Sequence, residues 1–119
     1  MEVQELEKLI KEKCVNSILL IYLTITNNTA ARQPVLMNNI KDFHSSTRFD
    51  IPFFFDARRF AENVHFIKEF ENGYKNRSIS SIVKEMFSYV DGFSISFKKD
   101  GLANIGGTVN YLDEKKSSF

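Results

Sequence analysis

Three short apolar runs, with amphipathic segments between them, constrain the fold of this chain more than any other feature of its sequence. Residues 17–25 form a continuous, β-branched apolar run, residues 51–55 read Ile-Pro-Phe-Phe-Phe, and residues 93–97 read Phe-Ser-Ile-Ser-Phe. Short apolar runs bounded by turn residues are typical of strands, and a continuous run indicates a strand buried on both faces, as in a parallel sheet. We therefore predict a strand over residues 17–25 that is buried on both faces, a second buried strand over residues 51–55, an alternating strand over residues 93–97 and a fourth strand over residues 105–112.

Helical patterns separate these strands. Residues 2–12 carry apolar groups at helical spacing, residues 36–46 are weakly helical, and residues 58–72 keep near-helical spacing. Ser78 or Ser80 can cap a further helix, because a serine side chain accepts a hydrogen bond from the first turn. The alternation of helices and strands predicts an α/β fold.

The length and net charge of the chain limit which classes of function it can have. The chain has 119 residues, which is one domain at most, and a net charge of +1. Its Lys and Arg residues are scattered, which argues against a nucleic-acid partner. The run over residues 17–26 is too short to cross a bilayer, and no signal peptide is visible. The lone Cys14 can form no internal disulfide, which fits a reducing compartment. Together with the absence of a visible signal peptide and of a run long enough to cross a bilayer, this leads us to expect a cytoplasmic protein with no membrane partner.

The end of the sequence favours a fragment. Residues 115–119 read Lys-Lys-Ser-Ser-Phe and follow a strand-like segment without a closing element. We interpret residues 1–119 as a single partial domain.

Polar residues follow the predicted strands, at the positions where open α/β sheets bind ligands. Asn28 follows the first strand, Asp56 the second, and residues 96–100 the third. A carboxylate that ends an apolar strand is partly desolvated unless a cation meets it, although Asp56 could instead cap the next helix. Lys98 and Lys99 are adjacent, and an amine beside a second cation is more readily the neutral nucleophile of a Schiff base; a solvated turn is the alternative.

Other motifs are weaker or absent. Gly106 and Gly107 mark a tight turn or a close backbone approach. His44 and His65 have no metal-ligand spacing with a second His or Cys. There is no Walker loop, dinucleotide-binding glycine motif or nucleophile elbow.

Longer blocks of sequence place these positions in a family. Six blocks stand in a fixed order: residues 26–28 (TNN), 33–35 (QPV), 55–63 (FDARRFAEN), 66–69 (FIKE), 85–89 (EMFSY) and 98–107 (KKDGLANIGG). In order and spacing they resemble the tryptophanase and tyrosine phenol-lyase family of β-eliminating lyases. The resemblance covers nearly the whole chain.

The resemblance implies a fold and an activity. The fold is part of the large-domain sheet of the aspartate-aminotransferase-like (fold type I) pyridoxal-phosphate enzymes. The activity is that of a carbon–carbon lyase that uses pyridoxal 5'-phosphate and converts an aromatic amino acid to pyruvate, ammonia and an indole or phenol. A monovalent cation, potassium, and a homotetramer are implied as well. In the family, the residues that recognise the side chain of tryptophan or tyrosine lie outside this stretch.

The resemblance also implies roles around the reactive end of the cofactor. Lys99 matches the lysine that holds pyridoxal phosphate covalently, and Lys98 matches a neighbouring active-site lysine. Asp56 matches the carboxylate paired with the pyridine nitrogen, and Arg59 the arginine close to that ring. An anion beside the ring nitrogen keeps it protonated, and a protonated ring stabilises a substrate carbanion.

Three further positions carry over in the same way. Asn28 matches an asparagine near the cofactor's ring oxygen, Ser96 a serine near its phosphate, and Asn104 a residue of the monovalent-cation site.

Departures from the family pattern favour a second interpretation. Arg32 stands in a loop where the family has glycines, and Phe97 precedes the lysine pair where the family has a small residue. The family's phosphate-binding loop, its stacking aromatic and its substrate-binding arginine lie outside this stretch. The alternative is therefore a non-catalytic truncated remnant, and we expect no turnover from this chain alone. A third class, a binding module that reuses the fold, has no positive support in the sequence.

Overall fold

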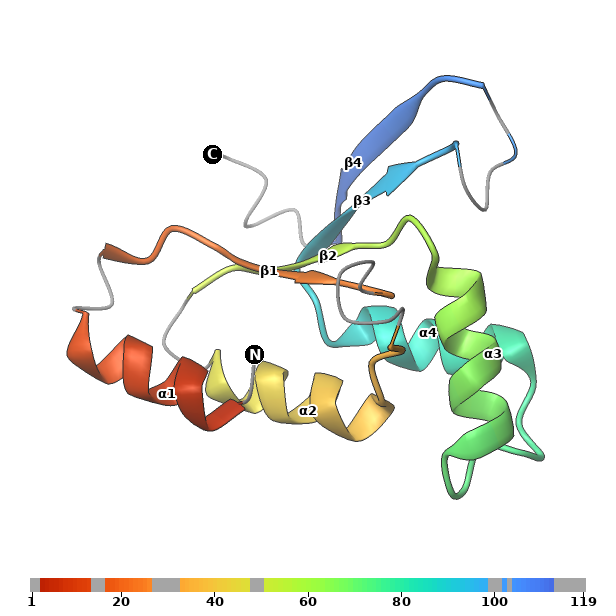
Figure 1. Cartoon of the computed structure of the whole chain (residues 1–119), viewed down its shortest axis with the longest axis horizontal. Helices are drawn as coiled ribbons and strands as arrows, with labels where there is room; N and C mark the ends of the chain where they lie inside the picture. The colour runs from red at the N-terminus through yellow and green to blue at the C-terminus, as the bar shows by residue number, and fades with distance from the viewer. Residues whose placement is uncertain are drawn as a thin grey trace.

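The computed structural model describes residues 3–13, 17–26, 33–47, 51–98, 102 and 104–112. Along this part of the chain (Figure 1) the elements are α1 (Val3–Glu12), β1 (Ile21–Thr24), α2 (Met37–Ser46), β2 (Phe53–Asp56), α3 (Phe60–Phe70), α4 (Ile79–Ser88), β3 (Gly92–Ser96) and β4 (Gly107–Tyr111). No helix in these ranges has the length and apolar character needed to cross a membrane.

The strands form one mixed sheet in the order β1-β2-β3-β4. The pairs β1–β2 and β2–β3 are parallel, with Leu23 beside Phe55 and Phe55 beside Phe93. The pair β3–β4 is antiparallel, because the connection over residues 97–106 is too short for a crossover to a parallel strand. The predicted α/β class and the predicted fourth strand are both confirmed.

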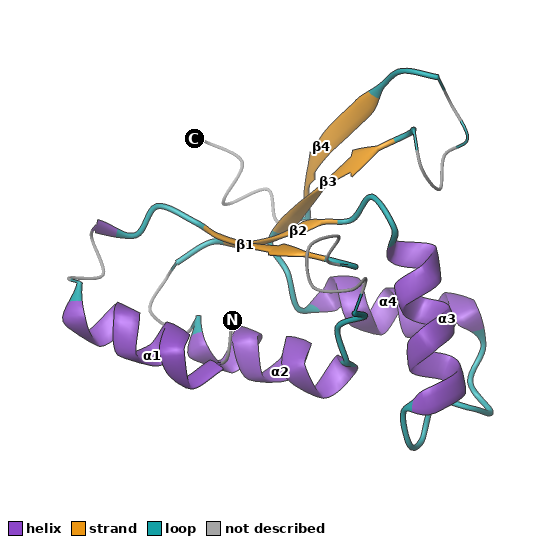
Figure 2. Ribbon diagram, in the orientation of Figure 1, coloured by secondary structure: helices purple, strands orange, loops and turns teal. Residues whose placement is uncertain are grey.

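The described helices lie on one face of the sheet (Figure 2). Parallel strands that follow one another in sheet order, joined by crossovers of the same hand, place their helices on the same side. The core therefore lies between the sheet and this helix layer. Its largest fully buried side chains come from both: Phe53, Phe55, Ile25, Met37, Ile40, Ile67, Ile82, Met86, Val64 and Asn63.

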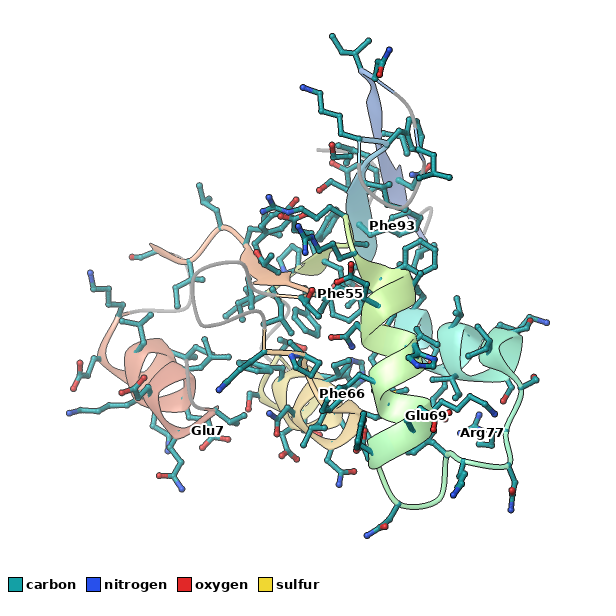
Figure 3. All side chains as sticks on the ribbon, turned by 45° about the vertical axis from the view of Figure 1, so that its right-hand side comes forward. Glu7, Phe55, Phe66, Glu69, Arg77 and Phe93 are labelled. Carbon is teal, nitrogen blue, oxygen red and sulfur yellow. The ribbon has the colours of Figure 1, made fainter. Side chains whose placement is uncertain are left out.

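Aromatic rings join the sheet to α4. Phe87 of α4 meets Phe55 edge-on with 5.7 Å between ring centroids, and Phe93 at 4.9 Å. Phe55 and Phe93 thus point from the sheet into the helix layer (Figure 3). Edge-to-face pairs at this spacing add to the stabilisation from burial.

The prediction that residues 17–25 form a strand buried on both faces is wrong. β1 spans only Ile21–Thr24. The side chains before and within it are exposed, to 85% at Leu19, 45% at Leu20 and 48% at Tyr22. The physical reason is the one-sided helix layer, because no described helix covers the second face of the sheet.

The N-termini of two helices are satisfied in different ways. Ser78 caps α4, where its hydroxyl accepts a hydrogen bond from the Ser81 backbone N–H at 3.2 Å, so one of the two predicted caps is confirmed. α2 has no cap of its own. The Glu71 carboxylate accepts hydrogen bonds from the backbone N–H groups of Met37 at 2.8 Å and Asn38 at 3.1 Å. A residue 34 positions away in sequence therefore caps α2.

Candidate functional site

A cavity of about 490 Å³ lies at the carboxyl ends of β2 and β3. Asp56, Ser96 and Lys98, three of the predicted site residues, line it together with Arg58. They meet because β2 and β3 are parallel neighbours and end at the same edge of the sheet. On the cavity wall, the hydroxyl of Tyr22 is hydrogen-bonded to that of Ser94.

Asp56 is the acidic centre of this edge. Its side chain is 15% exposed, and its Oδ2 accepts hydrogen bonds from Arg58 Nη2 at 2.6 Å and Arg58 Nε at 3.0 Å. The backbone N–H of Arg58 approaches Oδ1 at 3.4 Å. The N-cap of α3 is Arg59, without a side-chain cap, so Asp56 does not cap that helix. Of the two interpretations of Asp56, the structure supports the carboxylate met by a cation.

Arg59 is adjacent in sequence but has a different environment. Its side chain is 12% exposed, and Nη1 lies 3.6 Å from Glu62 Oε2. Its Nε is buried and has no hydrogen-bond partner within the described part of the chain. A buried donor without a partner costs about 1–3 kcal/mol, and Arg59 is not among the residues that line the cavity.

The β3–β4 hairpin contributes the remaining described residues. Ser96 is half-buried at the end of β3, and Lys98 is exposed just after it. A Cβ on Gly107 would lie 2.7 Å from the Ile95 carbonyl oxygen, and Gly106 has a φ of +130°. Of the two interpretations of this glycine pair, the close backbone approach is confirmed at Gly107, which begins β4.

The other predicted site residues are only partly located. Lys99 and Asn28 lie outside the described residues, as does Arg32. Asn104 is exposed on the hairpin. Within the described ranges, His, Cys, Asp and Glu side chains form no cluster of three that could hold a metal ion. A cation site at Asn104 stays a prediction.

Asn63 is a positioning residue that the sequence analysis missed. It is fully buried in α3, where its Oδ1 accepts a hydrogen bond from the Val35 N–H at 2.8 Å and its Nδ2 donates to the Val35 carbonyl at 2.9 Å. Both backbone groups of Val35 are thus satisfied by one side chain, which fixes the segment before α2. The available signal was an asparagine three residues after Phe60, on the apolar stripe of the predicted helix.

Comparison with known proteins extends the likeness over most of the chain. Residues 1–115 match the family described as "Beta-eliminating lyase". A probable β-eliminating lyase from Trichomonas vaginalis is 47% identical over 91% of this chain and 24% of its own length. A tyrosine phenol-lyase from Clostridium tetani is 48% identical over 96% of this chain and 25% of its own. A tryptophanase from Salinibacter ruber is 51% identical over 80% of this chain and 20% of its own. The chain therefore spans about a quarter of the length of the curated relatives that it matches, or slightly less.

Proposed function

The chain belongs to the β-eliminating lyase family, a family of enzymes, and on that premise we propose that it carries part of the cofactor site of a pyridoxal-phosphate-dependent carbon–carbon lyase. The reaction of the whole enzyme would be β-elimination of an aromatic amino acid to pyruvate and ammonia. The observation that carries the proposal is the position of Asp56. Within the matched region, it turns a carboxylate into the cavity at the edge of a parallel sheet.

The described residues fit the chemistry of this cofactor. Bound pyridoxal phosphate supplies an electron sink, which works best when its ring nitrogen is protonated. Asp56 would hold that positive charge, because an anion a few ångströms away favours the charged form. Arg59 has a buried Nε–H without a partner among the described residues, and would donate it to an acceptor at the ring. The half-buried Ser96 hydroxyl would donate to a phosphate oxygen.

Other parts of the proposal rest on family membership alone. Lys99 would hold the cofactor covalently and, once released from it, would move protons at the substrate; Lys98 would be its neighbour in that role. Asn28 would contact the ring oxygen, and Asn104 would help to bind potassium. The sheet would form part of a fold type I large domain in a cytoplasmic homotetramer.

The second candidate function is a non-catalytic remnant of such an enzyme, favoured by one specific observation: Phe97, which is 36% exposed, precedes the lysine pair where the family has a small residue. The chain covers only about a quarter of its relatives, so most of a complete lyase lies outside it. We propose that the chain alone binds pyridoxal phosphate weakly and forms no pyruvate from tryptophan or tyrosine.

Titration of the chain with pyridoxal phosphate, followed by absorbance, tests the proposal. Asp56→Ala should weaken binding at least about tenfold, because it removes one charge-assisted contact to the ring. Glu12→Ala, which removes an exposed carboxylate of α1, is the matched control and should leave binding unchanged. Equal affinity in the parent chain and Asp56→Ala would contradict the proposed site, and pyruvate formed by the parent chain would contradict the remnant interpretation.

A further inference from the structure

Arg58 and Arg59 are neighbours in sequence, but only Arg58 contacts the Asp56 carboxylate. Both Nε and Nη2 of Arg58 bind Oδ2, and its backbone N–H faces Oδ1. Arg59 instead forms an ion pair with Glu62, with Nη1 3.6 Å from Oε2. The two arginines are therefore not interchangeable at this site.

The Arg58 guanidinium lies where a cationic ligand of Asp56 would have to bind. Asp56 and Arg58 line the same cavity, and Arg58 is 33% exposed against 15% for Asp56. The guanidinium thus occupies Oδ2 of the carboxylate. A second cation can reach Asp56 fully only if the guanidinium moves away or shares the carboxylate.

We propose that Arg58 is a built-in competitor of the cofactor's ring nitrogen for the Asp56 carboxylate, so that it weakens pyridoxal phosphate binding and sets the concentration at which the site fills. This inference rests on the proposed function. It concerns a residue that the family resemblance gives no role.

The direction in which cofactor affinity changes when Arg58 is removed distinguishes competition for Asp56 from the mere loss of a positive charge. The phosphate is an anion, so removal of any nearby positive charge should weaken its binding. If Arg58 competes for Asp56, its removal should instead strengthen binding. An exposed or half-exposed ion pair contributes about 0.2–1 kcal/mol, which corresponds to at most about a fivefold change in affinity.

The experiment compares the parent chain with Arg58→Gln. Each is incubated with increasing pyridoxal phosphate and reduced with borohydride, and the labelled fraction at Lys99 is measured by mass spectrometry. Lys8→Gln removes one positive charge from an exposed ion pair of α1 and controls for net charge. Circular dichroism checks that all three chains keep the same fold. A cofactor analogue with carbon in place of the ring nitrogen isolates the contact with Asp56.

We expect half-maximal labelling of Arg58→Gln at about a threefold to fivefold lower cofactor concentration than in the parent, with no such gain in Lys8→Gln and none with the analogue. Labelling of Lys99 in Arg58→Gln alone would support the inference still more strongly. Labelling of Lys99 in the parent that is equal or weaker in Arg58→Gln would overturn the inference and leave the proposed function standing. Absence of Lys99 labelling in both chains would overturn the proposed function and the inference with it.

Discussion

Glu85 is held by three neighbouring side chains. Arg77 forms an ion pair with its Oε2, while Lys41 lies 3.1 Å from Oε1 and the Tyr74 hydroxyl donates to Oε1 at 2.9 Å. Burial alone would raise the pKa of Glu85, but the hydrogen bonds from Arg77, Lys41 and Tyr74 outweigh it and lower the pKa from 4.5 to about 2. The hydrogen bond to Tyr74 and the one to Glu85 raise the pKa of Lys41.

This cluster predicts a stability that depends on pH. Because the pKa of Glu85 is lower in the folded chain, its ionised form stabilises the fold above pH 4.5, and that stabilisation is lost as the pH falls towards about 2. Glu85→Gln should lower the free energy of unfolding by about 1–2 kcal/mol at pH 7, a value reduced for partial exposure, with a difference that shrinks below pH 4.5. Urea denaturation at several pH values measures this. A difference that stays constant down to pH 2, or an equal effect of the exposed Glu69→Gln, would contradict the account.

At the residue scale, the sequence predicted the position of Asp56 but not the identity of its partner. A carboxylate after an apolar strand needs a cation or a donor, and that much follows from desolvation. Which of two successive arginines supplies it depends on backbone angles: Arg59 stands at the start of α3 with a φ of −132°, while Arg58 turns back to Asp56. Such angles are not encoded in residue type alone.

The cap of α2 is an interaction between elements. α2 begins after Leu36, which has no capping side chain, and the Glu71 carboxylate beyond the end of α3 accepts its first N–H groups. The positive end of the helix dipole also favours this anion. One glutamate thus holds the N-terminus of α2 against the end of α3.

We predict that Glu71→Ala lowers the free energy of unfolding by about 1–2 kcal/mol, the usual cost of losing an N-cap. Thermal melts of the two chains measure the change, and hydrogen exchange should show faster opening at Met37 and Asn38. Glu69→Ala, on the exposed side of α3, is the matched control and should change the melting temperature little. Equal melting temperatures for parent and Glu71→Ala would show that the cap is not formed in solution.

At the scale of elements, periodicity predicted every helix and strand of the described chain, with bounds that shift by a few residues. Alternation alone did not predict the reversal of β4; the short connection over residues 97–106 was the signal for it. It also overestimated the burial of β1, because an apolar run shows which side chains a strand could bury but not whether another element covers them. Residue spacing also could not show that Asn63 and Glu71 hold distant segments together, since the hydrogen bonds that they accept from Val35 and Met37 depend on the tertiary fold.

At the scale of the whole molecule, one face of the sheet is uncovered by described helices. A hollow of about 250 Å³ on this face is lined mostly by apolar side chains, among them Leu19, Phe54, Val109 and Tyr111. Leu19 is 85% exposed and Val109 62% exposed. Contiguous apolar surface of this kind promotes association, as do unpaired strand edges.

We therefore predict that the isolated chain self-associates. Leu19→Lys and Val109→Lys should each shift the chain towards the monomer, because a charge on the apolar face must be desolvated on association. Leu102→Lys is the matched control, since Leu102 is 93% exposed but does not line the hollow. Sedimentation velocity measures the distribution. A monodisperse parent monomer with a sharp cooperative melt would count against this account.

The same scale explains why cofactor binding should be weak. Under the proposed function, Asp56 and Arg59 would contact the ring and Ser96 would make one phosphate contact, while the matched stretch is only about a quarter of each relative. Losing two charge-assisted hydrogen bonds of about 1.5–3 kcal/mol each would weaken binding by roughly two to four orders of magnitude. The position at which the cofactor binds, more than its affinity, therefore tests whether the chain retains the site.

The most direct measurement is the map of lysines that pyridoxal phosphate labels after borohydride reduction, read by mass spectrometry in the parent chain and in Lys99→Ala and Lys98→Ala. The account predicts one dominant labelled position, Lys99, because under the proposed function a cofactor bound there would gain from the contact of its ring with the Asp56 carboxylate. The label should disappear in Lys99→Ala and persist in Lys98→Ala. Labelling spread evenly over the exposed lysines, and unchanged in Lys99→Ala, would contradict the claim that this chain keeps the cofactor site of its family.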